Sequence, residues 1–323
     1  MMKQVEYQSD RISAPIAPKI YRDRNRVHDD LYCHMLMEDL SVGIAPMSGV
    51  DRAGFTCQLI PEDNEFEKDL ISGLPNDYGD NNTLSEAVTD FISYVGKHLA
   101  YNGICIFEIV ASTDDLFKAH FGSPWTLVSI PPEDVVIFHN WLVQSVRGEA
   151  KGNRIIPLVL IPRHKCAVFT MPDEFGGKRG YKRLLLKLSS TNQMEESTAM
   201  MHSLRMGQSN YYDFSMHQKV LEIQRWKLSR LFGWHHRSYL DSKDVGTEYF
   251  RWRRLLEFRR TQLIIRHHIL ETLKKVVSRV GLKLGREVSL DIKVPRKVSD
   301  LDEALKLWEQ GGLEFDDVNE YLR

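Results

Sequence analysis

The sequence lacks any long apolar run. Nowhere in its 323 residues do about 18 uncharged apolar residues follow one another, which is the length that a bilayer-spanning helix needs. This excludes a transmembrane helix and predicts no membrane partner. Residues 1–30 also have no apolar stretch of the signal-peptide type. They are polar, contain Pro15 and Pro18, and are expected to form an arm.

Cysteine is scarce and dispersed. The chain has Cys33, Cys57, Cys105 and Cys166, and no two of them form a CxxC pair. This spacing argues against a zinc site of closely spaced ligands and against a disulfide framework. An intracellular protein with reduced thiols is expected.

The short signatures of several enzyme classes are absent as well. The sequence contains no GxGxxG, GxxxxGK[ST], HExxH or GxSxG motif, so it gives no sign of dinucleotide, P-loop, metalloprotease or serine-hydrolase chemistry. Histidine forms two doublets, His235-His236 and His267-His268. Adjacent side chains on a helix point about 100° apart, which is poor spacing for metal ligands. The histidine doublets are therefore not expected to bind a metal, and the sequence has no short motif that implies a cofactor or a catalytic residue.

What the sequence does contain is the composition of a folded protein. Hydrophobic residues make up 42% and charged residues 27%, and the length allows one large or two medium domains. The net charge of −1 conceals an asymmetry, because residues 178–297 hold 26 Lys and Arg against 11 Asp and Glu. Either this basic part meets nucleic acid or an acidic partner, or it pairs with the acidic part of a neighbouring copy in a ring or dimer.

Residues 53–170 are predicted to form an α+β domain with mostly antiparallel strands. Thr83 and Glu86 have the spacing of a capping box, and apolar residues then recur at helical spacing as far as Asn102-Gly103. Short apolar runs between turn residues predict strands at 53–60, 104–110, 125–130, 135–138, 141–146, 155–161 and 166–170. The acidic stretch 62–80 is rich in turn residues and is interpreted as a connection.

Mostly helical structure is predicted after Gly176-Gly177. Three helices without proline are expected at 180–206, 214–234 and 247–280. A strand and two short helices complete the chain, at 286–294, 299–310 and 315–322. Gly281 is expected to end the third long helix, and Ser299 is expected to cap the helix that follows the strand.

The third long helix is the strongest candidate for an interaction. It carries an apolar stripe that includes Leu263, Leu270 and Val277, which we expect to be buried. The same helix carries Arg251, Arg253, Arg254, Arg259, Arg260 and Arg266. Arginine binds phosphates without reading base sequence, but a helix packed in a ring beside acidic neighbours has the same composition. The sequence leaves both interpretations open.

Four segments follow one another in a recognisable order. They are SEAVTDFISYVGKHLAYNGICIFEIV, WTLVSIPPEDVVIF, PLVLIPRHKCAVFTMPDEFGGKRGYKRLLLKL and REVSLDIKVPRKVSDLDEALKLWEQGGLEFDDVNEYLR. Together they resemble, over residues 84–323, the portal (head-to-tail connector) proteins of tailed bacteriophages. The last segment is similar to the family's G-x-[LI]-[TS]-x-N-E-x-R pattern through Gly312, Leu313, Asn319, Glu320 and Arg323. The chain is short for the family and has only brief connectors at the places of the clip and the tunnel loop.

The resemblance implies a portal-like α+β fold in four parts. These are an N-terminal arm (1–50), a wing domain (51–177), stem helices with a reduced clip near 207–213 and a tunnel loop (178–246), and a long helix with a C-terminal wing or crown-side segment (247–323). The tunnel loop would span 235–246. Contact with DNA in the channel would come from His235, His236, Arg237 and Lys243.

The resemblance also implies a function. Portal proteins form dodecameric rings at one capsid vertex of the virion, after assembly in the host cytoplasm, and double-stranded DNA passes through them during packaging and ejection. They contact the major capsid protein, the terminase and head-tail adaptors, and the terminase rather than the portal hydrolyses ATP. The chain is thus expected to be structural and not an enzyme.

Two other classes of function compete with this one. A monomeric or dimeric helical protein could use residues 247–280 to bind nucleic acid without sequence preference. An enzyme could have a site without a short motif in residues 53–170. A large cyclic assembly would distinguish a portal from the monomeric or dimeric nucleic-acid-binding protein. Polar groups that converge in one pocket would favour the enzyme.

Overall fold

The computed structural model has the predicted α+β fold and describes residues 12–16, 31–46, 49–75, 81–112, 120–145, 156–205, 214–234 and 248–322. The strands are β1 (Ile12–Ile16), β2 (Thr56–Ile60), β3 (Ile104–Ala111), β4 (Trp125–Ile130), β5 (Val135–Phe138), β6 (Trp141–Ser145), β7 (Ile156–Pro162), β8 (Cys166–Thr170) and β9 (Ser289–Lys293). The helices are α1 (Leu31–Ile44), α2 (Gly49–Ala53), α3 (Asn64–Gly73), α4 (Leu84–Asn102), α6 (Gly177–Arg205), α7 (Phe214–Ser229), α8 (Glu248–Lys283), α9 (Val298–Glu309) and α10 (Phe315–Leu322).

The described strands pair into three sheets. Their orders are β1-β7-β6-β5, β4-β3-β8 and β2-β9. All of these pairs are antiparallel, and β3 is central in its sheet, so that Phe107 lies opposite Ser129 on β4 and Ala167 on β8. The predicted antiparallel arrangement is confirmed.

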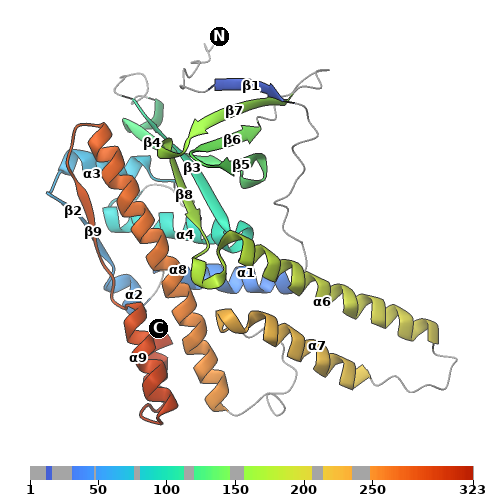
Figure 1. Cartoon of the computed structure of the whole chain (residues 1–323). Coiled ribbons are helices and arrows are strands. Elements are labelled where there is room, and N and C mark those ends of the chain that lie inside the picture. Colours follow the sequence, from blue (N-terminus) through green and yellow to red (C-terminus); the bar gives the residue numbers. More distant parts are fainter. Residues whose placement is uncertain are drawn as a thin grey trace.

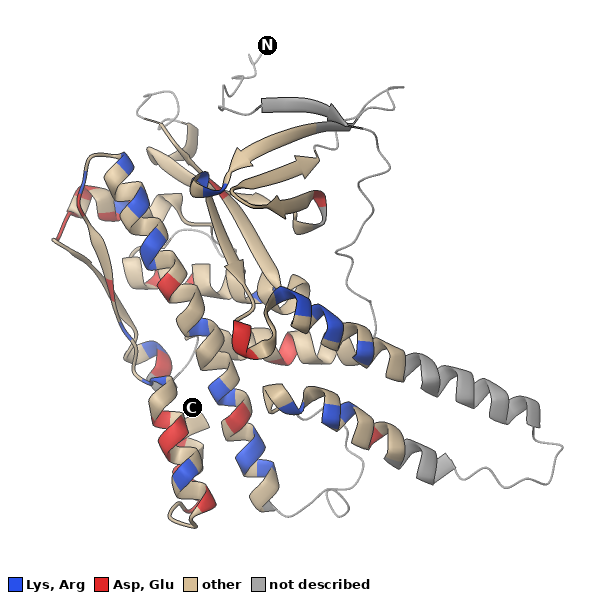
Figure 2. Ribbon diagram, viewed as in Figure 1, with Lys and Arg blue, Asp and Glu red and all other residues tan. Residues whose placement is uncertain are grey.

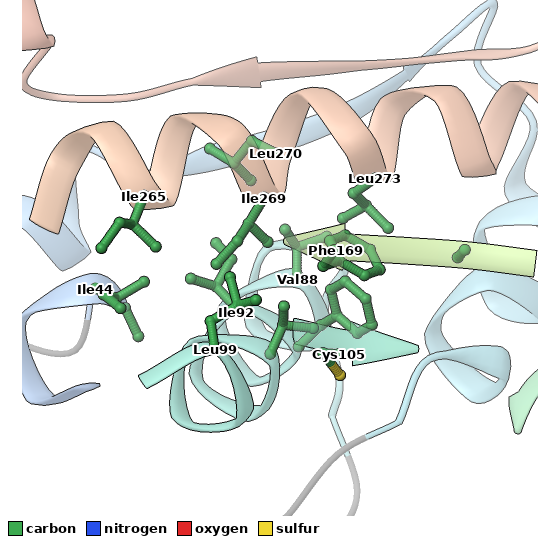
Figure 3. Packing of buried hydrophobic residues seen from close by; sticks show 14 of the residues in the cluster. Ile44, Val88, Ile92, Leu99, Cys105, Phe169, Ile265, Ile269, Leu270 and Leu273 are labelled. Atoms are coloured by element: carbon green, nitrogen blue, oxygen red, sulfur yellow. The ribbon is translucent and has the colours of Figure 1, made fainter. Parts of the chain in front are cut away.

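The main core lies where α4 and α8 meet the β3–β8 pair. Figure 3 shows Ile265, Ile269 and Leu273 of α8 above Ile92 of α4, with Phe169 of β8 beside them. Each of these five side chains is fully buried. Helix α1 adds Leu36, Met37, Leu40 and Ile44 to the same core, although the sequence placed this segment in an arm.

Helix α4 begins and ends as its sequence predicts. The Thr83 hydroxyl accepts a hydrogen bond from the Glu86 amide at 3.2 Å, and the Glu86 carboxylate accepts one from the Thr83 amide at 3.2 Å. At the other end Gly103 adopts the left-handed conformation (φ 68°), and its amide donates to the Leu99 carbonyl. Both features satisfy backbone groups that a helix end leaves unpaired, so the capping box is confirmed.

Helix α8 confirms the apolar stripe but not its predicted end. Leu263, Leu270 and Val277 are all buried, as expected from their spacing of seven. The helix continues past Gly281 to Lys283. Gly281 is needed for close packing, because a Cβ there would lie 2.6 Å from Cγ2 of Val288 and 2.8 Å from the carbonyl oxygen of Arg286. The prediction that Gly281 closes the helix is therefore wrong.

Two further local predictions are corrected. Helix α9 is capped by Lys297 rather than Ser299, and the Lys297 amide donates to the Asp300 carboxylate at 2.8 Å. The stretch 62–80, interpreted as a connection, contains helix α3. The Asp63 carboxylate caps α3 by accepting from the Phe66 amide at 2.9 Å, and the buried Phe66 anchors the helix to the core.

Helices α6 and α7 lie side by side and extend away from the sheets (Figure 1). The predicted helix 180–206 agrees with α6. The predicted helix 214–234 agrees with α7 together with the 3-10 turn Arg230–Phe232 that follows it. Helices α9 and α10 pack instead against α8. The chain therefore has an α+β body, a projecting helix pair, and a small C-terminal helical unit on the long helix α8.

Candidate functional surfaces

The four predicted channel residues, His235, His236, Arg237 and Lys243, lie outside the described residues. The chain is well anchored just before them. The Trp234 side chain is buried, and its indole N–H donates to the Asp39 carboxylate at 2.9 Å. The carbonyl oxygen of Trp234 accepts from the Ser229 hydroxyl at 2.9 Å. The chain is therefore fixed to the body at Trp234.

A buried ionic cluster lies in the middle of helix α8. The Asp51 carboxylate, from α2, accepts hydrogen bonds from the guanidinium groups of Arg259 and Arg266, the latter at 2.9 Å. All three side chains are buried. Arg259 also donates to the carbonyl oxygen of Gly43 at 2.6 Å, and Arg266 donates to that of Ile44 at 2.5 Å. The two arginines thus hold the end of α1 and helix α2 against α8.

The electrostatics of this cluster favour an ionised Asp51. Burial would raise the pKa of Asp51, but hydrogen bonding and charge from Arg266 and Arg259 outweigh it and hold the pKa below its usual value. Burial lowers the pKa of Arg259, and the charge of Asp51 opposes that change. The cluster is a structural site, and its two arginines are not available to bind phosphate.

Most of the other α8 arginines are also engaged within the chain. Arg253 pairs with Glu257 at 3.3 Å and with Glu309 of α9 at 2.7 Å, and Arg260 pairs with Asp302 of α9. The guanidinium carbon of Arg254 lies 4.7 Å from the ring centroid of Trp226 on α7. Arg279 of α8 donates to the carbonyl oxygens of His164 and Cys166. Among the arginines of α8, Arg251 is the one for which the described residues give no such contact. Because these arginines are engaged within the chain, they do not support the interpretation of α8 as an open phosphate-binding helix.

The first turns of α6 carry a row of exposed and half-buried basic residues that the sequence analysis did not single out (Figure 2). It consists of Lys178, Arg179, Lys182, Arg183 and Lys187. The spacing of four places Arg179 and Arg183 on one face. Burial, and the charge of Lys182, lower the pKa of Lys178. Lys187 faces Lys227 of α7 across a hollow of about 340 Å³. We call these five residues the α6 basic row.

A second hollow, of about 430 Å³, lies where α9 and α10 pack on the start of α8. Its aromatic lining is Tyr249, Trp308 and Phe315, and its carboxylates are Glu314 and Asp316. The rings of Tyr249 and Trp308 are stacked with centroids 5.2 Å apart, and Phe315 meets Trp308 edge-on at 5.4 Å. The Trp308 indole N–H donates to the Tyr249 carbonyl at 3.3 Å, which fixes the ring. We call this site the α9–α10 hollow.

The sequence could have indicated only part of these surfaces. The α6 basic row is visible in the KRGYKRLLLK segment as repeated basic residues at helical spacing. The α9–α10 hollow has no comparable signal, because Tyr249 and Trp308 are 59 positions apart. The acidic residues of the hollow, such as Asp316, are typical in sequence of the first turn of a helix and do not indicate a binding site.

The described residues offer little for metal or thiol chemistry. No three His, Cys, Asp or Glu side chains in the described ranges are placed to hold a metal ion. The four cysteines, all within these ranges, form no disulfide bond. Burial raises the pKa of Cys57 to about 12, and burial also raises that of Cys105, which keeps both in the weakly nucleophilic thiol form at neutral pH.

No described helix combines the length and the apolar composition that crossing a bilayer requires.

Comparison with known proteins gives matches among solved structures. No protein-family profile matches the sequence, and no curated protein matches it. Among solved structures, the chain is similar to an HK97 family phage portal protein from Corynebacterium diphtheriae. That similarity covers 86% of this chain and 99% of the other, with 10% sequence identity and a TM-score of 0.41. The two backbones are only weakly similar, and this similarity assigns neither a family nor an activity.

Proposed function

We propose that the chain is a portal-type structural protein. Copies of it would form a cyclic ring at one capsid vertex, through which double-stranded DNA passes during packaging and ejection. The observation that supports this proposal is the order of helices and strands along the chain. An α+β body leads through Gly176-Gly177 into the projecting pair α6 and α7, and the chain then returns in the single long helix α8. That order matches the wing, stem and tunnel-side helix of the family that the sequence resembles.

The domain layout of the proposal follows from the same order. Residues 51–177 would be the wing, 178–246 the stem with a reduced clip and a tunnel loop, and 247–323 the long helix with a wing or crown-side segment. Residues 1–50 would be an arm that is also tied to the body, because α1 packs in the main core. The ring would be a dodecamer, as in the family.

The partners of the proposed ring follow from its position. The major capsid protein would surround it, the terminase would dock during packaging, and a head-tail adaptor would replace the terminase later. Assembly would take place in the host cytoplasm, and the mature ring would reside in the virion. The chain would need no cofactor and would hydrolyse nothing, since the motor's ATPase belongs to the terminase.

Weak, sequence-independent contact with DNA suits such a channel, because tight binding would stall translocation. The internal pairing of the α8 arginines supports this choice over the competing nucleic-acid-binding helix. A helix that gripped phosphates would need those guanidinium groups exposed.

The proposed tunnel loop gives a direct test. Replacing Arg237 and Lys243 together with serine should leave ring assembly unchanged and alter the amount of DNA packaged or retained, because two phosphate contacts per subunit are removed. Assembly is measured on the purified protein by mass photometry, and packaged DNA is measured per particle.

A matched control replaces Lys283 and Lys293, both exposed and outside the loop, with serine. Wild-type packaging in the loop variant would remove the loop from the channel. Failed assembly would place Arg237 and Lys243 at a subunit interface instead.

A further inference from the structure

The α9–α10 hollow has the chemistry of a site for a cationic side chain. Three aromatic rings line it, and aromatic faces attract ammonium and guanidinium groups. Glu314 and Asp316 add two exposed carboxylates. Neither carboxylate forms an ion pair with another described residue. The hollow therefore offers both an apolar surface and unneutralised negative charge to the same ligand.

The surroundings of the hollow make the negative charge local and strong. Residues 298–322 contain eight Asp and Glu and one basic residue, Lys306. Two of these acids, Asp302 and Glu309, are occupied by α8 arginines, and Asp317 accepts from the Glu314 amide at 3.0 Å. Of the remaining acids, Glu303, Glu314, Asp316 and Glu320 are exposed. A basic partner is the chemistry that such a surface selects.

The chain itself carries the complementary surface. The first eleven residues of α6, 177–187, contain the five members of the α6 basic row and no acid. Arg179, Arg183 and Lys187 are exposed, and none of them forms an ion pair with another described residue. Their spacing of four along one helix lets several basic side chains approach one partner surface together.

The two surfaces lie on different sides of one molecule. The hollow sits where α9 and α10 pack on α8, whereas the α6 basic row belongs to the helix that packs on α1 and α7 (Figure 1). A contact between two different patches of identical chains is heterologous, and repeated contacts of this kind close into a ring when the rotation permits. One copy can therefore use both surfaces at once, each on a different neighbour.

We propose that the α9–α10 hollow of one copy receives basic side chains from the α6 basic row of the next copy. The inference rests on the proposed ring and names the surfaces that would join its subunits. Arg179 or Arg183 would lie against the aromatic lining of the hollow, and Glu314 and Asp316 would pair with basic side chains of the row. The contact would weaken with salt, because its carboxylates are exposed.

Charge reversal tests this pairing. The α6 reversal carries Arg179→Glu and Arg183→Glu, and the hollow reversal carries Glu314→Lys and Asp316→Lys. Either reversal alone should raise the protein concentration needed for assembly at low salt by about tenfold or more, because like charges then face one another. A chain with both reversals should recover most of the wild-type assembly, since opposite charges meet again. Mass photometry over a concentration series measures the shift.

Two controls keep the result specific. Lys275→Glu with Lys283→Glu reverses two exposed charges on α8 outside both surfaces and should leave assembly unchanged. Thermal unfolding of every variant checks the fold. If the hollow reversal unfolds, Glu314→Gln with Asp316→Asn removes the charge while keeping the shape, and it should weaken assembly in the same direction.

The outcomes separate the two proposals. A wild-type chain that never assembles contradicts the proposed ring and this inference together. A wild-type ring that tolerates both reversals, or a double reversal that fails to recover, overturns only the pairing of these surfaces. Unchanged assembly with loss of DNA binding in the α6 reversal would also overturn it, and would assign the α6 basic row to nucleic acid.

Discussion

Replacing Asp51 with asparagine is expected to lower the free energy of unfolding by about 3–5 kcal/mol. The Asp51 carboxylate is buried and neutralises two buried guanidinium groups, those of Arg259 and Arg266. Asparagine keeps the size of the side chain but leaves both positive charges uncompensated away from water. That loss is much larger than the value of an exposed ion pair.

Chemical denaturation followed by circular dichroism measures this effect. Asp302→Asn is the matched control, because it breaks the partly exposed pair with Arg260 on the same helix and should cost at most about 1 kcal/mol. Equal stabilities of the two variants would show that the Asp51 cluster is solvated or absent.

The same cluster predicts a pH dependence. The folded-state pKa of Asp51 is held below its usual value, so its stabilising contribution is fully present above the unfolded-state pKa of about 3.9. The contribution is lost as the pH falls through the lower, folded-state pKa. The stability difference between wild type and Asp51→Asn should therefore shrink in acid. A difference that grows as the pH falls would contradict the assigned direction.

The second large effect is expected in the core. Leu270→Ala should destabilise the fold by about 2–5 kcal/mol, because it removes a buried α8 side chain from the main core and leaves a cavity. Leu282→Ala, on the exposed side of the same helix, should change stability by no more than about 0.5 kcal/mol. Unchanged melting of Leu270→Ala would mean that the stripe does not face the core.

Features with local signals could be predicted from the sequence. Helix α4 has a capping box at Thr83 and Glu86 and a left-handed glycine at its end, so both bounds follow from a few neighbouring residues. The stripe of α8 follows from its repeat of seven. Helix α3 was missed because it is only ten residues long, and its exposed acidic residues hide the pattern of Phe66 and Leu70.

Features that depend on distant residues could not be predicted. Composition shows that α8 is rich in arginine, but not that Arg259 meets Asp51, which lies 208 positions away. Pairing of this kind converts apparent positive charge into internal structure, so the basic segment 178–297 exposes fewer cations than its count implies. Gly281 was misread for the same reason, since its role depends on the later approach of Val288. The assignment of Arg237 and Lys243 to a channel stays a prediction.

The central claim is that this chain assembles into a closed ring. Mass photometry of the purified protein at low salt, with negative-stain imaging of the same sample, tests it most directly. The proposal predicts one dominant high-order species, a ring of about twelve copies with a central channel, that dissociates as salt screens its intersubunit charges. A monodisperse monomer at low salt and high protein concentration would contradict it.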